Sequence, residues 1–128
     1  MNGAAELDIG PLTWVKGEID LALDRAGDAL RAFAANPPEE SQLKFAQTHL
    51  HQAHGALAIV GLEGITQFSE SLEQLLGAVE RGAVPFSAEV AAAAQEGLGA
   101  IHRYLDDLLA GDPDQPLKRR QRRLIEPA

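Results

Sequence analysis

The sequence has no cysteine and few aromatic residues. Among its 128 residues, phenylalanine, tryptophan and tyrosine together account for 5%. The lack of cysteine excludes disulfide bonds, thiolate zinc sites and thiol nucleophiles. Because aromatic residues are sparse while alanine and leucine are abundant, the composition favours helices over strands.

The sequence also has no long apolar run. It lacks the roughly 18 consecutive apolar residues that span a membrane, and it does not open with a basic and apolar leader. We therefore predict no membrane span and a cytoplasmic location. With 128 residues, 45% of them hydrophobic, the chain is long enough for one core and too short for two ordinary domains.

Basic residues are scarce outside the C-terminal end. Residues 1–117 carry 18 acidic and 6 basic side chains, a net charge of −12, whereas residues 118–128 carry 5 basic and 1 acidic, a net charge of +4. A core this acidic repels phosphate backbones, so we expect no nucleic-acid binding by the folded part. The basic run at residues 118–123 has two interpretations: a contact with nucleic acid or an anionic membrane, or, as is more common, a solvated linker.

Four segments of the chain have apolar residues at three- and four-residue steps, the spacing of one face of a helix. Breaks fall at residues 36–38, which contain two prolines, at residues 61–64, at Gly82 and at Gly111, and Ser87 can cap the last helix. The apolar faces are Leu12, Val15, Ile19, Ala22, Ala26, Leu30 and Phe33; then Leu43, Ala46, Leu50, Ala53, Leu57 and Val60; then Ile65, Phe68, Leu72, Leu75 and Val79; then Val90, Ala94, Leu98, Ile101, Leu105 and Leu108.

The connections between these segments are short, so successive helices are predicted to be antiparallel neighbours. The predicted fold is all-α, an antiparallel up-down-up-down four-helix bundle over residues 7–111. Residues 112–128 are predicted to be a Pro/Asp linker and a basic tail, which we expect to be disordered.

One histidine of the second segment stands out by its direction. At about 100° per residue, His51 lies roughly 130° from the centre of the apolar face, so its side chain is predicted to point to water. Lys44, Gly55 and Ala58 project in roughly the same direction. Glycine inside a helix costs roughly 0.5–1 kcal/mol relative to alanine, so Gly55 requires a reason such as close approach by a partner.

The spacing of His51, Gly55 and Gly61 carries a family resemblance. A histidine followed by glycines four and ten residues later is how a histidine-containing phosphotransfer (Hpt) domain presents its phosphorylatable imidazole, and this chain resembles that family. Family members usually have lysine where this chain has His54. A Leu-Glu pair commonly follows the family's histidine by 21 and 22 residues, and Leu72-Glu73 occupies those positions here.

The start of the chain has a narrower resemblance. Residues 7–15, Leu-Asp-Ile-Gly-Pro-Leu-Thr-Trp-Val, look like the N-terminal Hpt-like module of CheA-like hybrid kinases that govern type IV pili and twitching motility. The resemblance covers about residues 7–110. In such modules the histidine site is often degenerate.

The resemblance implies a function for His51. It would accept a phosphoryl group from a histidine kinase catalytic domain and pass it to the aspartate of a response-regulator receiver domain. A histidine is largely neutral at pH 7, so the attack needs no separate base. In this family the magnesium and the acidic pocket belong to the partner, so we predict that the domain has no cofactor. We also predict that it is a phosphocarrier, on its own or within a larger histidine kinase, rather than a self-sufficient enzyme.

The family's lysine helps to position and neutralise phosphoryl oxygens. His54 would do this only when protonated, and Lys44, two turns before His51, would substitute in part. His54 also has a plainer interpretation, as a side chain packed at the apolar boundary. The predicted contacts with the phosphoryl group or partner are therefore Lys44, His54, Gly55 and Ala58.

Other functions remain open. The chain is alternatively a phosphorylation-incompetent Hpt-like domain that docks a receiver or scaffold protein in a chemosensory or pilus-control system, or a generic bundle with a solvated surface histidine. His51 and His54 are three apart and could share a metal, but no carboxylate flanks them at helical spacing, so we predict no metal site. His49 and His102 are interpreted as ordinary helix residues, and no nucleophile elbow or phosphate-binding glycine loop occurs. Gly97 and Gly99 are predicted to be close-packing positions.

Overall fold

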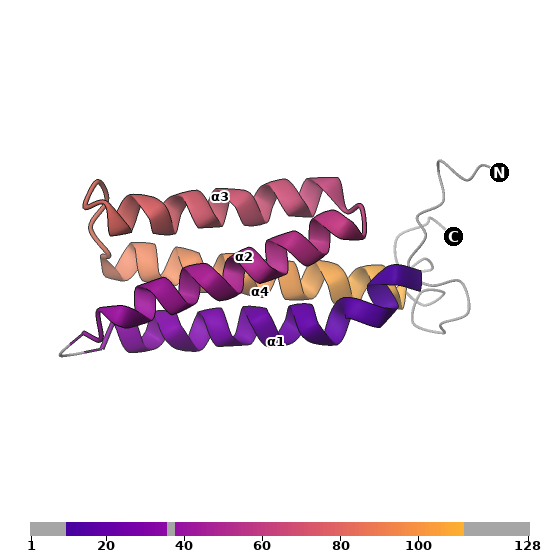
Figure 1. The fold of residues 1–128 in the computed structure, drawn as a ribbon, viewed down its shortest axis with the longest axis horizontal. Helices are drawn as coiled ribbons and strands as arrows, with labels where there is room; N and C mark the ends of the chain where they lie inside the picture. The colour runs from indigo at the N-terminus through magenta and orange to yellow at the C-terminus, as the bar shows by residue number, and fades with distance from the viewer. Residues whose placement is uncertain (1–9, 36–37, 112–128) are drawn as a thin grey trace, which may run out of the picture.

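A computed structural model of the chain describes residues 10–35 and 38–111. It contains four α-helices, α1 (Gly10–Phe33), α2 (Ser41–Ile59), α3 (Glu63–Glu80) and α4 (Ala88–Ala110), and no strand occurs in the described part. The helices run alternately up and down, and α2 lies obliquely between α1 and α3, in front of α4 (Figure 1). The predicted all-α four-helix bundle is therefore confirmed.

The core is built from leucine, isoleucine and alanine contributed by all four helices. The largest side chains with almost no exposed surface are Leu12, Ile19, Leu23, Leu50, Leu57, Leu76, Ile101 and Leu105. Full burial of one such side chain stabilises the fold by about 1.5–3 kcal/mol. On α2 the predicted apolar face is buried from Leu43 to Leu57, which fixes which side of this helix faces water.

The inward face of α3 is shifted from the predicted one, although Ile65, Leu72 and Val79 of that face do contact the core. The structure buries Ser69, Leu72 and Leu76, whereas Phe68 is 40% exposed. The inward face is therefore rotated by roughly 50° from the one that the apolar spacing indicated. Ser69 fits inside because its hydroxyl donates a hydrogen bond to the carbonyl oxygen of Thr66, at 2.7 Å, so no polar group is left unpaired.

Two glycines make the sharp turns that the antiparallel order needs. Gly61 follows α2 with φ +80° and Gly82 follows α3 with φ +77°, in the left-handed region that favours glycine. At the first turn the amide of Leu62 donates to the carbonyl of Leu57, at 3.3 Å, which closes the end of α2. At the start of α4 the Ser87 hydroxyl accepts a hydrogen bond from the amide of Val90, as predicted.

Gly97 lets α4 approach α3 closely. A Cβ atom at this position would lie 2.7 Å from Cδ2 of Leu72, closer than two carbon atoms pack. At Gly99 a Cβ atom would meet only the flexible end of Arg103, at 3.2 Å. The prediction of close packing is thus confirmed for Gly97 and wrong for Gly99.

Some predictions concern residues beyond those that the structure describes. The motif at residues 7–9 and the linker and tail at residues 112–128 lie outside them, so the proposed boundaries at residues 7 and 111 remain predictions. Within residues 10–35 and 38–111, no helix combines the length and the apolarity that crossing a membrane requires.

Candidate functional site

His51 lies near the middle of α2, on the side away from the core. Its side chain is 73% exposed, as the position of the apolar face predicted. Its neighbour Leu50 is only 1% exposed, so the helix is anchored directly behind the imidazole. The imidazole is thus presented to solvent from a rigid, packed helix.

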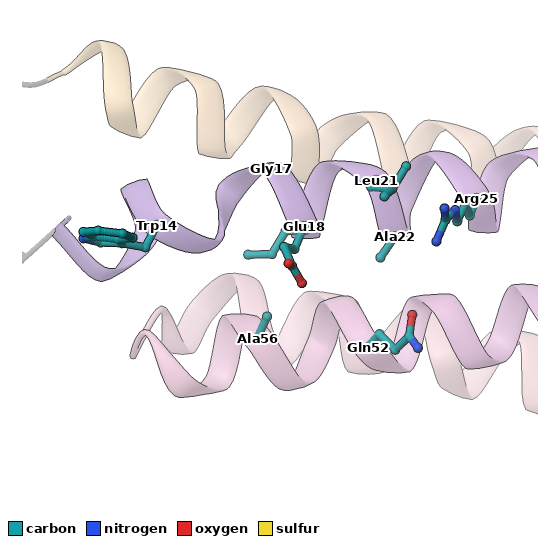
Figure 2. A pocket seen from close by; sticks show the side chains of 9 residues that line it. Trp14, Gly17, Glu18, Leu21, Ala22, Arg25, Gln52 and Ala56 are labelled. Atoms are coloured by element: carbon teal, nitrogen blue, oxygen red, sulfur yellow. The ribbon is translucent and has the colours of Figure 1, made fainter.

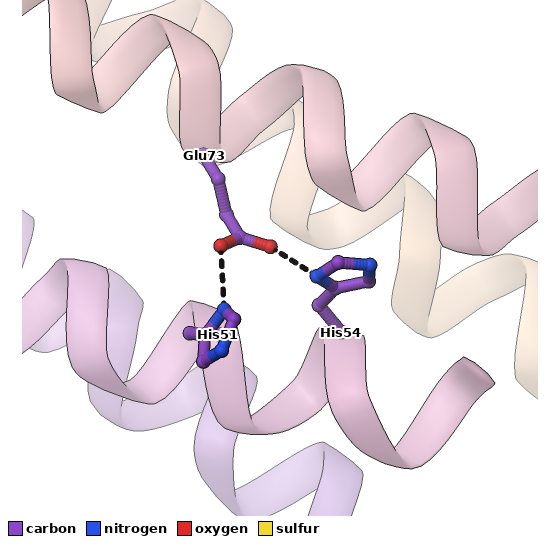
Figure 3. Close-up of side chains that lie close together, drawn as sticks. All are labelled: His51, His54 and Glu73. Atoms are coloured by element: carbon purple, nitrogen blue, oxygen red, sulfur yellow. Dashed lines mark hydrogen bonds and ion pairs between the residues drawn. The ribbon is translucent and has the colours of Figure 1, made fainter. Parts of the chain in front are cut away.

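Glu73 on α3 holds one edge of this imidazole. Its Oε1 lies 2.8 Å from Nδ1 of His51 (Figure 3). An ionised carboxylate only accepts hydrogen bonds. In this contact Nδ1 therefore carries the N–H and donates a hydrogen bond to Glu73. A neutral imidazole has a single N–H, and Nε2 is therefore left with a free lone pair, which is the nucleophilic form of this atom.

His54 faces the second oxygen of the same carboxylate. Its Nδ1 lies 2.6 Å from Oε2 of Glu73, and its ring meets that of His51 edge-on, with centroids 5.7 Å apart. Nδ1 of His54 and Oε2 of Glu73 are both closed off from solvent, and neither has a hydrogen bond of good geometry. The residue in the family's lysine position therefore turns toward α3 and shares Glu73 with His51.

Lys44 is engaged elsewhere. Its ammonium donates to Oε2 of Glu80, near the end of α3, while the side-chain amide of Gln47 donates to Oε1 of Glu80 at 3.2 Å. Hydrogen bonds from Lys44 and then Gln47 lower the pKa of Glu80 below its usual value. Lys44 lies two turns before His51, about 10 Å along the helix axis. The structure therefore does not bring Lys44 next to the imidazole.

The two glycines of the motif, Gly55 and Gly61, occur for different structural reasons. Gly61 makes the left-handed turn after α2. Gly55, in contrast, is an exposed residue of the helix itself, four residues before its end at Ile59, and a Cβ atom there would meet nothing within 4 Å. The described residues thus give no packing reason for Gly55. Ala58 is also exposed, so positions 55 and 58 of the helix surface beyond His51 carry no bulky side chain.

A groove between α1 and α2 adjoins this surface, and sequence analysis did not predict it. Trp14 and Leu21 of α1 and Gln52 and Ala56 of α2 are among the residues that line it (Figure 2). Trp14 is 87% exposed. Ile59, four residues after Gly55, is 85% exposed. Large exposed apolar side chains that border a groove are candidates for contact with a partner. The exposed Trp14 on the predicted first helix was the available sequence signal.

The remaining histidines are held by neighbours within the bundle. Nδ1 of His102 on α4 lies 2.9 Å from Asp20 and Nε2 lies 3.1 Å from Asp24, both on α1. Nδ1 of His49 lies 3.2 Å from the side-chain amide oxygen of Gln52. His102 thus ties α4 to α1, a role that its interpretation as an ordinary helix residue did not include.

Comparison with protein families assigns the chain. The family model described as "Hpt domain" matches residues 12–111, a range that covers nearly all of the four helices. The chain belongs to the Hpt domain family. Hpt domains serve histidine phosphotransfer in the phosphorelays of two-component signalling, and they interact with receiver and kinase domains. No curated protein and no solved structure matched the chain.

Proposed function

We propose that this Hpt domain accepts a phosphoryl group on Nε2 of His51 and passes it to the aspartate of a response-regulator receiver domain. The observation that carries the proposal is an exposed imidazole whose Nδ1 is held by Glu73, 2.8 Å away, so that Nε2 faces outward with its lone pair free. No other histidine of the chain combines this exposure with an open helix surface beyond it.

The transfer has two steps. The lone pair of Nε2 attacks the phosphorus of the donor, the P–N bond forms, and the bond from phosphorus to the donor's leaving group breaks. The imidazole ring becomes cationic in this step, and the negative charge of Glu73 beside Nδ1 stabilises it. In the second step the receiver's aspartate attacks phosphorus, the P–N bond breaks, and Nε2 regains its lone pair.

The surface around His51 suits a docking partner. Gly55 and Ala58 leave the approach to the imidazole free of bulky side chains. The groove at Trp14 and the exposed side chain of Ile59 offer apolar contact area on the same helix pair. Protein interfaces combine such apolar anchors with a polar rim. We propose that the receiver domain binds across α1 and α2 on this side.

The partners follow from the family and from the narrower resemblance at residues 7–15. We propose that a histidine kinase catalytic domain phosphorylates His51 and that the pathway is a chemosensory system controlling type IV pili. We propose that the domain lies in the cytoplasm, together with the kinase that feeds the relay. The domain acts as a phosphocarrier, either alone or as one module of a larger kinase.

A second candidate function is docking without phosphorylation. It is favoured by the replacement of the family's lysine, because His54 faces Glu73 and Lys44 is bound to Glu80, so neither side chain takes the place of that lysine at Nε2 of His51. In this case the same surface would bind a receiver or scaffold protein permanently rather than in a phosphorylation cycle.

Labelling separates the two candidates. The domain is incubated with phosphoramidate or with a cognate kinase and ATP, and acid-labile phosphate is measured by intact mass. We expect one phosphoryl group on the wild type, none on His51→Gln, and retained labelling on His49→Gln, His54→Gln and His102→Gln. No labelling of a folded wild type favours docking alone, and labelling that survives in His51→Gln contradicts the assignment of His51.

A further inference from the structure

We propose that His51, His54 and Glu73 form a Zn²⁺ site. One ligand atom from each of these residues, an imidazole nitrogen or a carboxylate oxygen, lies within 4.8 Å of the other two. Two imidazole nitrogens and a carboxylate are ligands that zinc prefers, and three protein ligands with an open fourth position are a common zinc arrangement. No carboxylate lies at helical spacing from the two histidines on α2, because Glu73 comes from α3 across the helical hairpin.

The distances suit an ion between the three side chains. Zinc binds nitrogen and oxygen at about 2.0–2.2 Å, so two ligands of a tetrahedral ion lie roughly 3.3 Å apart. The present Nδ1-to-oxygen distances are 2.8 Å for His51 and 2.6 Å for His54. Opening each by about half an ångström or slightly more needs only small side-chain rotations, because both Nδ1 atoms already face the carboxylate.

The polar groups of this cluster are incompletely satisfied without an ion. Nδ1 of His54 and Oε2 of Glu73 are shielded from solvent and lack hydrogen bonds of good geometry. Apart from their contact with each other at 2.6 Å, these shielded atoms have no polar neighbour that the hydrogen bonds account for, and a bound cation would offset the cost of shielding them through direct coordination. The excess of acidic side chains in residues 1–117 further attracts cations to this domain. The exposed side of His51 leaves the fourth position open to water.

Zinc binding has a chemical consequence that rests on the proposed function of His51. When Nδ1 coordinates zinc through its lone pair, the proton of the neutral ring must lie on Nε2. Nε2 then has no lone pair with which to attack phosphorus. Zinc and the phosphoryl group would therefore exclude each other at His51, and zinc would act as an inhibitor of phosphoryl uptake.

The binding claim is tested by titrating Zn²⁺ into the metal-free full chain by calorimetry, with circular dichroism to check the fold. We expect one ion per chain in the wild type and an affinity weaker by about tenfold or more in His54→Gln and in Glu73→Gln. His49→Gln and His102→Gln are matched controls that each remove one imidazole elsewhere and should leave the affinity unchanged. Unchanged affinity in both His54→Gln and Glu73→Gln, or its loss in His102→Gln, would overturn the proposal.

A second experiment separates this proposal from the proposed function. Phosphoramidate labelling is measured with zinc and with a chelator, in the wild type and in His54→Gln. We expect zinc to suppress labelling of the wild type and to suppress it far less in His54→Gln. Absent labelling even with the chelator contradicts phosphotransfer but leaves the calorimetric result standing. Full labelling of zinc-saturated wild type contradicts the exclusion.

Discussion

His51 and Glu73 lie eleven residues on either side of Leu62 and meet at 2.8 Å across the hairpin of α2 and α3. Lys44 and Glu80 lie eighteen residues on either side of the same leucine and are also paired. Antiparallel helices joined by a short turn bring residues equidistant from the turn level with each other. Both contacts therefore follow from one register.

Glu73 should matter for the reactivity of His51. Glu73→Gln keeps the shape of the side chain but removes the negative charge that fixes the Nδ1 proton and stabilises the cationic ring. We expect the rate of phosphoryl uptake from phosphoramidate to fall by about tenfold or more, given the larger effect that such carboxylates have in catalytic triads. The measurement is the initial labelling rate in the presence of a chelator. Glu80→Gln on the same helix is the control, and equal rates for Glu73→Gln and Glu80→Gln would refute this role.

Gly55 should be required by the partner rather than by the fold. Gly55→Arg adds bulk where the described residues leave open space, and arginine forms helices better than glycine. We expect receiver binding to weaken severalfold or more while helical content stays the same. The measurement is a titration with a receiver domain. Ala93→Arg, which adds the same side chain to an exposed position of α4, should bind as the wild type does; equal losses in both variants would place the interface elsewhere.

The two glycines of α4 should respond in opposite ways to a methyl group. In Gly97→Ala the new Cβ would collide with Leu72, so we expect a strain of about 1–3 kcal/mol that outweighs the gain in helix propensity of about 1 kcal/mol. In Gly99→Ala the gain should prevail, because only the movable end of Arg103 is near. Urea unfolding of both variants tests this, and a Gly97→Ala variant as stable as Gly99→Ala would show that Leu72 moves aside without cost.

Lys16 should stabilise the bundle in a pH-dependent way. Its ammonium lies 2.6 Å from Asp20 and 2.7 Å from Asp106. Burial alone would lower its pKa, but hydrogen bonds to Asp106 and Asp20 and their charges outweigh this and raise the pKa above 10.5. A lysine whose pKa is raised on folding contributes its full stabilisation below the unfolded pKa and loses it as the pH rises through the folded pKa.

Lys16→Met tests this linkage. We expect the variant to be less stable than the wild type by about 1 kcal/mol at neutral pH, with the difference shrinking only above pH 10.5. The free energy of unfolding of both proteins in urea, measured from neutral pH to about pH 11, gives the comparison. A difference that stays constant or grows at alkaline pH would contradict it.

The bundle could be predicted from the sequence because its determinants are local. Helix lengths, the turns at Gly61 and Gly82, the Ser87 cap and the exposure of His51 all depend on residues within one or two turns of each other. The rotation of α3 could not be predicted from the sequence. By polarity Phe68 is expected inside and Ser69 outside, whereas packing against the other helices buries Ser69 and leaves Phe68 exposed.

The site was predicted only in part, for the same reason. The direction of His51 follows from α2 alone, whereas the partner of its Nδ1 comes from α3. Glu73 belongs to the family pattern, and its equal spacing from Leu62 indicates that it lies opposite His51. The position of His54 depends on the same carboxylate, and the pairing of Lys44 depends on Glu80, so neither could be read from one helix.

The three-residue connection between α2 and α3 restricts how this domain can evolve. Surface loops normally tolerate insertions, because their length changes little else. Here the connection is only three residues long, and a single added residue between Ile59 and Glu63 that was taken up by α3 would displace every later position of that helix by one place, about 100° around its axis, relative to α2. Glu73 would leave His51 while the core leucines lost their partners. Length variation among relatives that keep this site should therefore be confined to the other two connections and to the ends of the chain.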